Sequence, residues 1–210
     1  MQYTDVGKTW HTLSLITGHA RRDPDFQFTS LAHLLDVEYL RDCYESLNRN
    51  RAVGIDNVSW EDYGKSLNEN LEKLVSRLKR KKYNPIPARR VYIPKSETEN
   101  RPLGISALEN KMVERGITWI LESIYEEDFL KSSYGFRPNR NAHQALKEVN
   151  DLIMWQPVNH IVEADIKGFF DNVSHEKLMG FIRIRIGDTR LLNLIERFLK
   201  AGYVDDGILY

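Results

Sequence analysis

Apolar residues recur at steps of three and four over several stretches of the chain, which is the spacing of one face of an α-helix. The longest stretch begins at Trp60 and runs to about Lys82, where a series of cations complements the dipole of a helix C-terminus. Other helical patterns cover residues 10–16, 37–47, 112–127, 142–153, 175–182 and 189–199, and one begins at Leu31. The pattern therefore predicts a helix-rich protein.

Short strands separate the helices. Pro85 and Pro87 end the long helical pattern, and residues 89–93 then alternate between polar and apolar side chains, as a strand does. A polar loop at residues 95–100 leads into a second short strand at residues 101–106. Helices interspersed with short antiparallel hairpins predict the α+β class rather than a doubly wound sheet.

Polar residues suited to capping stand at most of the expected helix starts, where a side-chain oxygen can accept a bond from a free backbone N–H group. Candidate caps are Asp36, Asn141, Ser174 and Asp188, with capping-box spacings in Ser59 with Asp62 and Ser106 with Glu109, and a terminating glycine at Gly202. Residues 1–26 show no clear periodicity beyond the short helix and are expected to form a leader.

The composition limits the class of protein. With 210 residues, 41% hydrophobic content and a mean hydropathy of −0.49, the chain can bury the core of one large domain or two small ones. No apolar run is long enough to cross a membrane, and the N-terminal region lacks a signal-peptide pattern, so no membrane partner is expected. Cys43 is the only cysteine, which excludes an internal disulfide and fits a reducing, cytoplasmic location.

Charge is balanced overall but not locally. The chain has 30 Lys and Arg and 30 Asp and Glu, yet nine cations and only two Glu lie between Arg77 and Arg101. Such a stripe is typical of a surface that binds a polyanion, although a solvated helix face explains a run of lysines equally well. The candidate RNA-binding cations of this stripe are Arg77, Lys79, Arg80, Lys81, Lys82, Arg89 and Arg90.

The stretch with the clearest chemistry is His160-Ile-Val-Glu-Ala-Asp-Ile-Lys-Gly-Phe-Phe-Asp-Asn172. It opens with a short apolar strand, places the Asp165 carboxylate where that strand ends, and continues into a turn with one glycine and two aromatic residues. A carboxylate on a rigid element, beside a loop that can admit a phosphate, suits a divalent cation. The alternative is an ordinary buried strand, with Asp165 as a turn residue or helix cap.

Six blocks along the chain resemble those of bacterial group II intron-type reverse transcriptases, in the order found in that family. They are Ala52-Val-Gly-Ile-Asp56, Val91-Tyr-Ile-Pro-Lys95, Arg101-Pro-Leu-Gly-Ile105, Ser133-Tyr-Gly-Phe-Arg-Pro138, Ala142-His-Gln-Ala-Leu146 and Ala164-Asp-Ile-Lys-Gly-Phe-Phe170. The resemblance implies an RNA-directed DNA polymerase with right-hand architecture, which also binds group II intron RNA as a maturase. It implies a leader at residues 1–26, fingers with an N-terminal helical extension at 27–106, and palm with returning fingers elements at 107–210.

The resemblance also assigns roles to individual residues. Asp165 corresponds to the first metal-binding, catalytic aspartate of the palm, and the carbonyl of Ile166 usually joins it on Mg²⁺. Two Mg²⁺ ions stabilise the attacking and leaving oxygens when the 3′-hydroxyl of a DNA primer attacks a dNTP on an RNA template. Lys95 and Arg101 of the hairpin would neutralise the triphosphate, the alternative being a solvated hairpin.

The turn after Asp165 is implied to complete the nucleotide site. Backbone N–H groups of Gly168 and Phe169 would bind the phosphates, and the ring of Phe170 would exclude a 2′-hydroxyl and thereby select deoxynucleotides. The alternative for the two phenylalanines is core packing, which we expect for one of them.

Residues 133–140 combine aromatic side chains with Arg137 and Arg140. This mixture is typical of surfaces that hold single strands and nucleic-acid backbones, so both arginines are candidate RNA-binding residues. A structural loop shaped by Gly135 and Pro138 explains the same residues equally well.

The residues Tyr203-Val-Asp-Asp206 match the second metal-binding motif of the family, but their spacing from Asp165 differs from that of the family. Only 38 residues separate Asp165 from Tyr203, and the glycine- and proline-bearing block that precedes this motif in the family is absent. Tyr203 directly follows a helix end, and Asp206-Gly207 is a turn signal. We therefore interpret residues 203–210 as a connector and expect an incomplete palm, so that this chain binds RNA without polymerising.

Two other hypotheses stay open. The first is a non-catalytic RNA-binding module, which the basic stripe supports. The second is a reverse transcriptase of a diversity-generating or CRISPR-linked system, since such enzymes share the same blocks. An incomplete palm would expose apolar surface, so a homodimer is also predicted.

Overall fold

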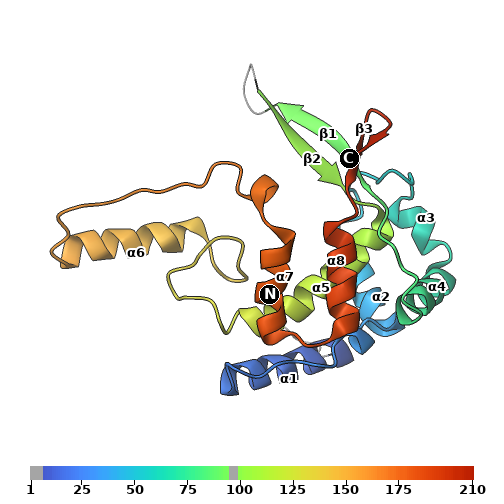
Figure 1. The fold of residues 1–210 in the computed structure, drawn as a ribbon, viewed down its shortest axis with the longest axis horizontal. Helices are drawn as coiled ribbons and strands as arrows, with labels where there is room; N and C mark the ends of the chain where they lie inside the picture. Colours follow the sequence, from blue (N-terminus) through green and yellow to red (C-terminus); the bar gives the residue numbers. More distant parts are fainter. Residues whose placement is uncertain (1–6, 95–98) are drawn as a thin grey trace.

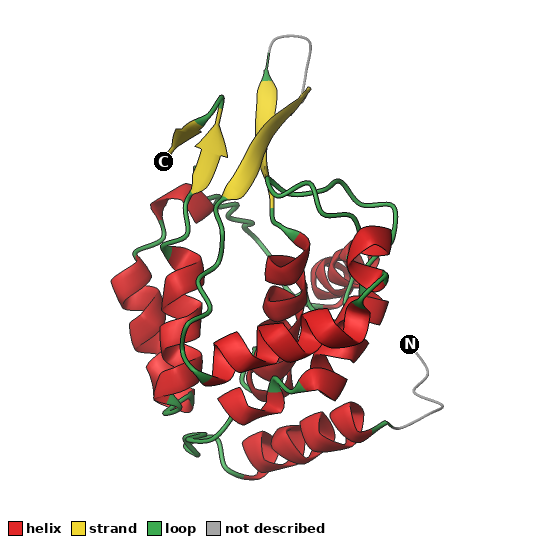
Figure 2. Ribbon diagram, turned by 90° about the vertical axis from the view of Figure 1, so that its right-hand side faces the viewer, coloured by secondary structure: helices red, strands yellow, loops and turns green. Residues whose placement is uncertain are grey.

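The structure is a computed structural model that describes residues 7–94 and 99–210, and it consists of a helical body with a small β-sheet at one end (Figures 1 and 2). The predicted α+β class is confirmed. The helical elements are α1 (Lys8–Arg22), η1 (Ala32–Leu34), α2 (Val37–Ser46), α3 (Trp60–Gly64), α4 (Leu67–Lys79), α5 (Leu108–Tyr125), α6 (Ala142–Trp155), η2 (Phe170–Asn172), α7 (His175–Arg185) and α8 (Thr189–Leu199). The strands are β1 (Ala88–Pro94), β2 (Asn100–Ile105), β3 (Tyr203–Asp205) and β4 (Ile208–Leu209).

Helix α5 lies at the centre of the core. It contacts α1 and α2, and its buried residues include Met112, Val113, Ile120 and Ile124. The same apolar cluster takes in the buried faces of α4, α7 and α8. Burial of this continuous cluster is the main stabilising contribution to the fold, because each apolar side chain removed from water contributes about 1.5–3 kcal/mol.

Helix α1 is longer than the pattern of residues 10–16 predicts. It packs against α5 through the buried side chains of Leu13, Ile16 and Ala20. The ring of Trp10 also lies 4.7 Å from that of Trp119, measured between centroids. The N-terminal region is therefore part of the helical body from Lys8 onward.

The predicted caps are confirmed at α2, α3, α6, α7 and α8. The capping side chains are those of Asp36, Ser59, Asn141, Ser174 and Asp188, and each accepts a hydrogen bond from a backbone N–H group of the first turn. The capping box predicted at Ser106 and Glu109 is wrong. Ala107 occupies the N-cap position of α5, and the Ser106 hydroxyl instead donates to the Glu114 carboxylate at 3.0 Å.

The single helix predicted over residues 60–82 is wrong in one respect, because a bend at residues 65–66 divides it into α3 and α4. A Cβ atom at Gly64 would lie 2.5 Å from the hydroxyl oxygen of Tyr44, so α3 lies directly against α2. Ser66, with φ −130° and ψ 41°, then leaves helical geometry and redirects the chain into α4.

A four-stranded sheet in the order β2-β1-β3-β4 lies at one end of the helical body (Figure 2). β1 and β2 form the predicted antiparallel hairpin, in which Arg89 stands opposite Ile105. β3 lies parallel to β1, a non-local pairing that the sequence does not predict, and β4 returns antiparallel to β3. The predicted turn at Asp206 and Gly207 is confirmed, with positive φ values of 45° and 82°.

Helix α6 stands apart from the helical body and is joined to it by long connections (Figure 1). An apolar stripe at helical spacing ordinarily predicts a buried face, but α6 has no buried residue and Leu146, Val149 and Ile153 are exposed. Periodicity predicts an amphipathic helix but not the element that covers it. Neither α6 nor any other helix in the described residues is long and apolar enough to cross a membrane.

Candidate active site and RNA-binding surface

The segment that carries Asp165 is an extended connection between α6 and α7, at residues 156–169 (Figure 1). The short strand predicted just before Asp165 does not form among the described residues. The side chains of Ile161 and Val162 are 72% and 89% exposed. The backbone of a strand must bond to a neighbouring strand, and none of the described strands pairs with this segment. The alternative of an ordinary buried strand is therefore wrong as well.

The turn after Asp165 has the defined shape that its glycine predicts. Gly168 has a φ of 60°, in the left-handed region that glycine adopts without strain. Asn172 closes the turn, because its side-chain amide and its backbone N–H donate to the Gly168 carbonyl at 2.8 and 3.2 Å. A short closed loop therefore follows the Asp165 carboxylate.

Phe169 and Phe170 are both exposed, and their rings meet edge to face with centroids 5.4 Å apart. The expectation that one of them packs in the core is wrong for the described structure. Since Phe170 is 80% exposed, its ring is accessible to a ligand, and its role in selecting deoxynucleotides stays a prediction.

The hairpin cations differ in how they are held. Lys95 lies outside the described residues, and Arg101 is exposed on β2. At the base of the hairpin, Arg89 donates to a backbone carbonyl of the loop before α3 at 2.9 Å. Arg90 lies with its guanidinium carbon 3.5 Å from the centroid of the Tyr203 ring, which ties β1 to β3. The arginines at the base are therefore fixed in place, whereas Arg101 faces solvent.

The cations at the end of α4 are accessible. They are Arg77, Lys79, Arg80, Lys81 and Lys82, all of them exposed. Arg77 forms an ion pair with Glu109 at 2.6 Å and lies over the ring of Tyr83, so part of its charge is neutralised. The remaining four cations, Lys79, Arg80, Lys81 and Lys82, carry most of the positive charge of this surface.

In the loop at residues 133–140 the two arginines have different surroundings. The side chain of Arg137 is 8% exposed, forms an ion pair with Glu126 at 3.0 Å and donates to two backbone carbonyls at 2.8 and 3.0 Å. Arg140 donates to one carbonyl at 2.7 Å and lies over the ring of Tyr134. The geometry favours the structural alternative for Arg137, and RNA binding by Arg140 stays a prediction.

The Tyr203-Val-Asp-Asp206 segment forms β3 and the start of its turn. The hydroxyl group of Tyr92 on β1 donates to the Asp205 carboxylate, so this acid is engaged within the sheet. Among the residues that the structure describes, no three carboxylate, imidazole or thiol groups gather as a metal site. The metal site predicted at Asp165 therefore has no complete set of ligand side chains among the described residues.

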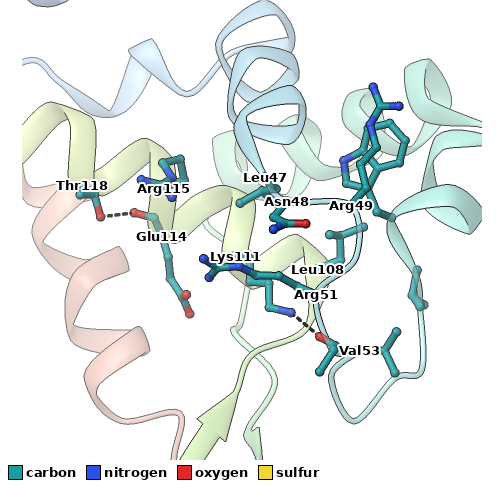
Figure 3. A pocket seen from close by; sticks show the side chains of 13 residues that line it. Leu47, Asn48, Arg49, Arg51, Val53, Leu108, Lys111, Glu114, Arg115 and Thr118 are labelled. Carbon is teal, nitrogen blue, oxygen red and sulfur yellow. Dashed lines mark hydrogen bonds between the residues drawn. The ribbon is translucent and has the colours of Figure 1, made fainter. Parts of the chain in front are cut away.

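One group of cations has no counterpart in the sequence predictions. Arg49, Arg51, Lys111 and Arg115 line a pocket between the loop after α2 and helix α5 (Figure 3). Lys111 donates to the carbonyl of Ala52 at 2.7 Å although 59 positions separate the two residues. Each cation resembles an ordinary surface charge in the sequence, and only the position of Arg49 and Arg51, just before the Ala52-Val-Gly-Ile-Asp56 block, could have singled them out.

Comparison with known proteins identifies relatives. The family model described as reverse transcriptase (RNA-dependent DNA polymerase) matches residues 93–208. Group II intron-encoded protein LtrA of Lactococcus lactis subsp. cremoris is 36% identical over 202 residues, which cover 94% of this chain and 33% of LtrA. Protein YkfC of Escherichia coli K12 is 35% identical over 201 residues, covering 90% of this chain and 51% of YkfC. Nuclear intron maturase 1, mitochondrial, of Arabidopsis thaliana is 27% identical over 95 residues, 44% of this chain and 13% of that protein.

The chain thus spans about a third of LtrA and half of YkfC. The family match covers more than half of the chain and includes β2, the Asp165 turn and β3. The resemblance to group II intron-type proteins, inferred from six short blocks, is confirmed by these relatives. The chain belongs to the reverse transcriptase (RNA-dependent DNA polymerase) family.

Proposed function

We propose that this chain supplies the fingers and the first part of the palm of an RNA-directed DNA polymerase of the group II intron type. The observation that carries the proposal is the continuous family match over residues 93–208, which contains both the hairpin strand β2 and the Asp165 turn. The proposed regions are a leader at 1–26, which contributes α1 to the helical body, fingers with an N-terminal helical extension at 27–106, and palm with returning fingers elements at 107–210. The proposed location is the cytoplasm.

In this proposal the Asp165 carboxylate and the Ile166 carbonyl are oxygen ligands of Mg²⁺. Oxygen donors are the ligands that Mg²⁺ prefers, and bound Mg²⁺ stabilises negative charge on transferring phosphates. No three candidate ligand side chains gather in the part of the chain that the structure describes. Asp165 alone holds at most part of a metal site.

The dNTP would lie between the hairpin and the Asp165 turn. Lys95 and Arg101 would pair with its phosphates, and the backbone N–H groups of Gly168 and Phe169 would donate to them. The Phe170 ring would contact the sugar. The closed turn at Gly168 and the exposure of Phe170 and Arg101 support these roles.

RNA is the second proposed partner, as template paired with a DNA primer and as intron RNA bound in the manner of a maturase. The exposed cations Lys79, Arg80, Lys81 and Lys82 support it, together with relatives whose names refer to group II introns and to an intron maturase. A non-catalytic RNA-binding module would use the same cations. Polymerisation distinguishes the two functions.

We expect this chain to bind RNA but not to extend a primer, because Asp205 ends β3, which pairs with β1, and Asp206 lies in the turn that follows. Neither carboxylate stands on a strand next to Asp165. The measurement is primer extension on an RNA template with the wild type, Asp165→Asn and Asp206→Asn, alongside RNA binding by fluorescence anisotropy. Extension by the wild type that both substitutions abolish would show that the palm is complete and that our interpretation of residues 203–210 is wrong. Absence of RNA binding would refute the proposed function itself.

The exposed apolar face of α6 predicts self-association. Leu146, Val149 and Ile153 form a stripe at helical spacing, and contiguous apolar surface of this kind favours association in water. We expect light scattering to give the mass of a dimer, and Leu146→Glu to shift it towards the monomer. Lys147→Glu changes the neighbouring exposed position outside this stripe and should leave the dimer intact. A monomeric wild type would contradict the prediction.

A further inference from the structure

A second pocket of the helical body has an apolar floor. It has a volume of about 280 Å³ and lies where η1, the end of α4 with the loop that follows it, and α8 meet. The side chains that form its floor are buried or half-buried, and they are those of Leu35, Leu78, Tyr83 and Leu194. Since an apolar cavity of about 150 Å³ already holds benzene, this pocket has room for a large apolar side chain.

Positive charge surrounds the floor. The rim carries four cations and His33, and no acidic residue of the described chain lines the pocket. The cations of the rim are Lys79, Lys81, Arg190 and Arg197. Uncompensated charges of one sign at a concave site attract a ligand of the opposite sign. The ligand that complements both parts of the pocket is therefore apolar at its centre and acidic around it.

Three cations of the rim are not used elsewhere. Among the residues that the structure describes, the side chains of Lys79, Lys81 and Arg190 make no hydrogen bond or ion pair. Arg190 stands in the first turn of α8, which holds no acidic residue to balance it. The capping carboxylate of Asp188 accepts from backbone N–H groups instead. These three side chains are therefore available to carboxylates of a ligand.

The floor and one wall of the pocket are held in place. The guanidinium group of Arg197 donates to the backbone carbonyls of Lys81 and Tyr83, both at 2.8 Å, and so fixes the loop after α4 against α8. The Tyr83 hydroxyl in turn donates to the side-chain oxygen of Asn110 at 2.8 Å. A pocket that is ordered before binding avoids the cost of ordering its side chains in the complex.

The floor distinguishes this pocket from a nucleic-acid site. Single strands are held by cations together with aromatic faces on which the bases stack. Tyr83, the aromatic residue of the floor, is only 2% exposed, and its ring packs near Phe198 and Arg77. It therefore offers no free face to a base, whereas the leucines beside it suit an aliphatic or aromatic side chain of a protein.

The pocket also follows one face of α8. Its lining residues on that helix recur at steps of three and four, and they are Arg190, Asn193, Leu194 and Arg197. At a rise of about 1.5 Å per residue, this face extends over about 10 Å, or two helical turns. A partner helix that lies in such a groove presents its apolar anchors at the same spacing.

We propose that this pocket docks an acidic amphipathic helix of a partner protein. Its apolar side chains would enter the floor, and its Asp and Glu side chains would pair with Lys79, Lys81 and Arg190. The inference goes beyond the proposed function and does not depend on it. Because Lys79 and Lys81 are also candidate RNA-binding residues, a docked partner would cover part of that surface.

The experiment measures binding of a fluorescent synthetic peptide by anisotropy. The peptide has about 16 residues, enough to form a helix on a surface, with Leu and Phe at positions i, i+4 and i+7 and Glu beside them. A control peptide has the same composition in scrambled order. We expect the wild type to bind the amphipathic peptide about tenfold more tightly than the scrambled one, because only the first presents its anchors on one face.

Two exposed lining residues test the floor and the rim separately. Asn193→Trp fills the pocket, and Arg190→Glu reverses a charge of the rim. Each should weaken binding of the amphipathic peptide about tenfold or more. Lys177→Glu is the matched control, because it also reverses an exposed cation in the first turn of a helix, α7, but lies outside the pocket. It should bind as the wild type does, and circular dichroism verifies that the variants fold.

The outcomes separate the possible occupants. Loss of peptide binding in Asn193→Trp with unchanged binding of a short single-stranded RNA would support the docking site. An equal loss for the RNA would assign the pocket to nucleic acid and overturn the proposal. Equal affinity for the two peptides, or undiminished binding by Asn193→Trp and Arg190→Glu, would also overturn it. Tighter peptide binding by Leu146→Glu than by the wild type would show that α6 of a second copy fills the pocket, and would overturn the partner helix.

Discussion

Replacing Asp188 with alanine is expected to lower the free energy of unfolding by about 3 kcal/mol. The carboxylate accepts hydrogen bonds from the backbone N–H groups of Leu31 and Ala32 at 2.6 and 2.8 Å. It also accepts from those of Arg190 and Leu191, at 2.8 and 3.2 Å, and so caps α8. Alanine would remove the cap and leave the buried N–H of Leu31 without an acceptor. Urea denaturation followed by circular dichroism measures the loss.

Asp36 is a matched control, because it is also an aspartate cap but a more exposed one. It accepts one backbone bond, from Tyr39 at 2.9 Å, and pairs with Lys8 at the surface. Asp36→Ala should therefore cost only about 1 kcal/mol. Equal losses in the two variants would show that the hydrogen bonds that Asp188 accepts from Leu31 and Ala32, at the start of η1, contribute nothing to stability.

The pH dependence of stability tests the same carboxylate. Burial alone would raise the pKa of Asp188, but the backbone N–H groups of Ala32, Leu31, Leu191 and Arg190 outweigh it and hold the pKa below its ordinary value. The charged form is the stabilising one, so its contribution is complete above the unfolded pKa of about 3.9 and is lost as the pH falls through the lower folded pKa. The stability gap between the wild type and Asp188→Asn should narrow below about pH 4, and a gap unchanged in stronger acid would contradict this account.

Caps such as Asp188 could be predicted because their signal is local. A helix N-terminus exposes N–H groups within three residues of the cap, and the sequence of that turn contains everything needed. The hairpin β1–β2 is local in the same sense, since a short polar loop joins two alternating strands. The alignment of residues 93–208 with the family likewise rests on contiguous sequence.

Features that depend on distant partners were not predictable from one sequence. The apolar pattern of residues 161–164 is that of a strand, but in the structure no described strand bonds to it, and Val162 is exposed. Likewise, no described element packs against the apolar face of α6 closely enough to bury a residue of it. Pairing of β3 with β1 brings Tyr203 next to Ala88, and the basic pocket brings Arg51 and Lys111 together. The residues of each pair are too far apart in the sequence for a local periodic pattern to predict the contact.

Replacing Gly54 with alanine is expected to destabilise the fold by about 2–3 kcal/mol, because the added methyl group meets backbone rather than flexible side chains. A Cβ atom at Gly54 would lie 2.5 Å from the Cα atom and 2.7 Å from the nitrogen atom of Ala107, the N-cap residue of α5. Neither atom can move without shifting the start of that helix. The measurement is again urea denaturation.

Gly18→Ala in the middle of α1 provides a control of opposite sign. No atom lies within 4 Å of a Cβ atom there, so alanine only lowers the entropy of the unfolded chain and improves helix propensity. This variant should gain about 0.5–1 kcal/mol. If Gly54→Ala did not lower the free energy of unfolding, the loop that precedes Gly54 would not pack against the start of α5. The carbonyl groups of Ala52 and Val53 would then not be held in place as acceptors for Lys111 and Arg89. Close approach at Gly54 thus explains why a glycine stands between the cationic pocket and the base of the hairpin.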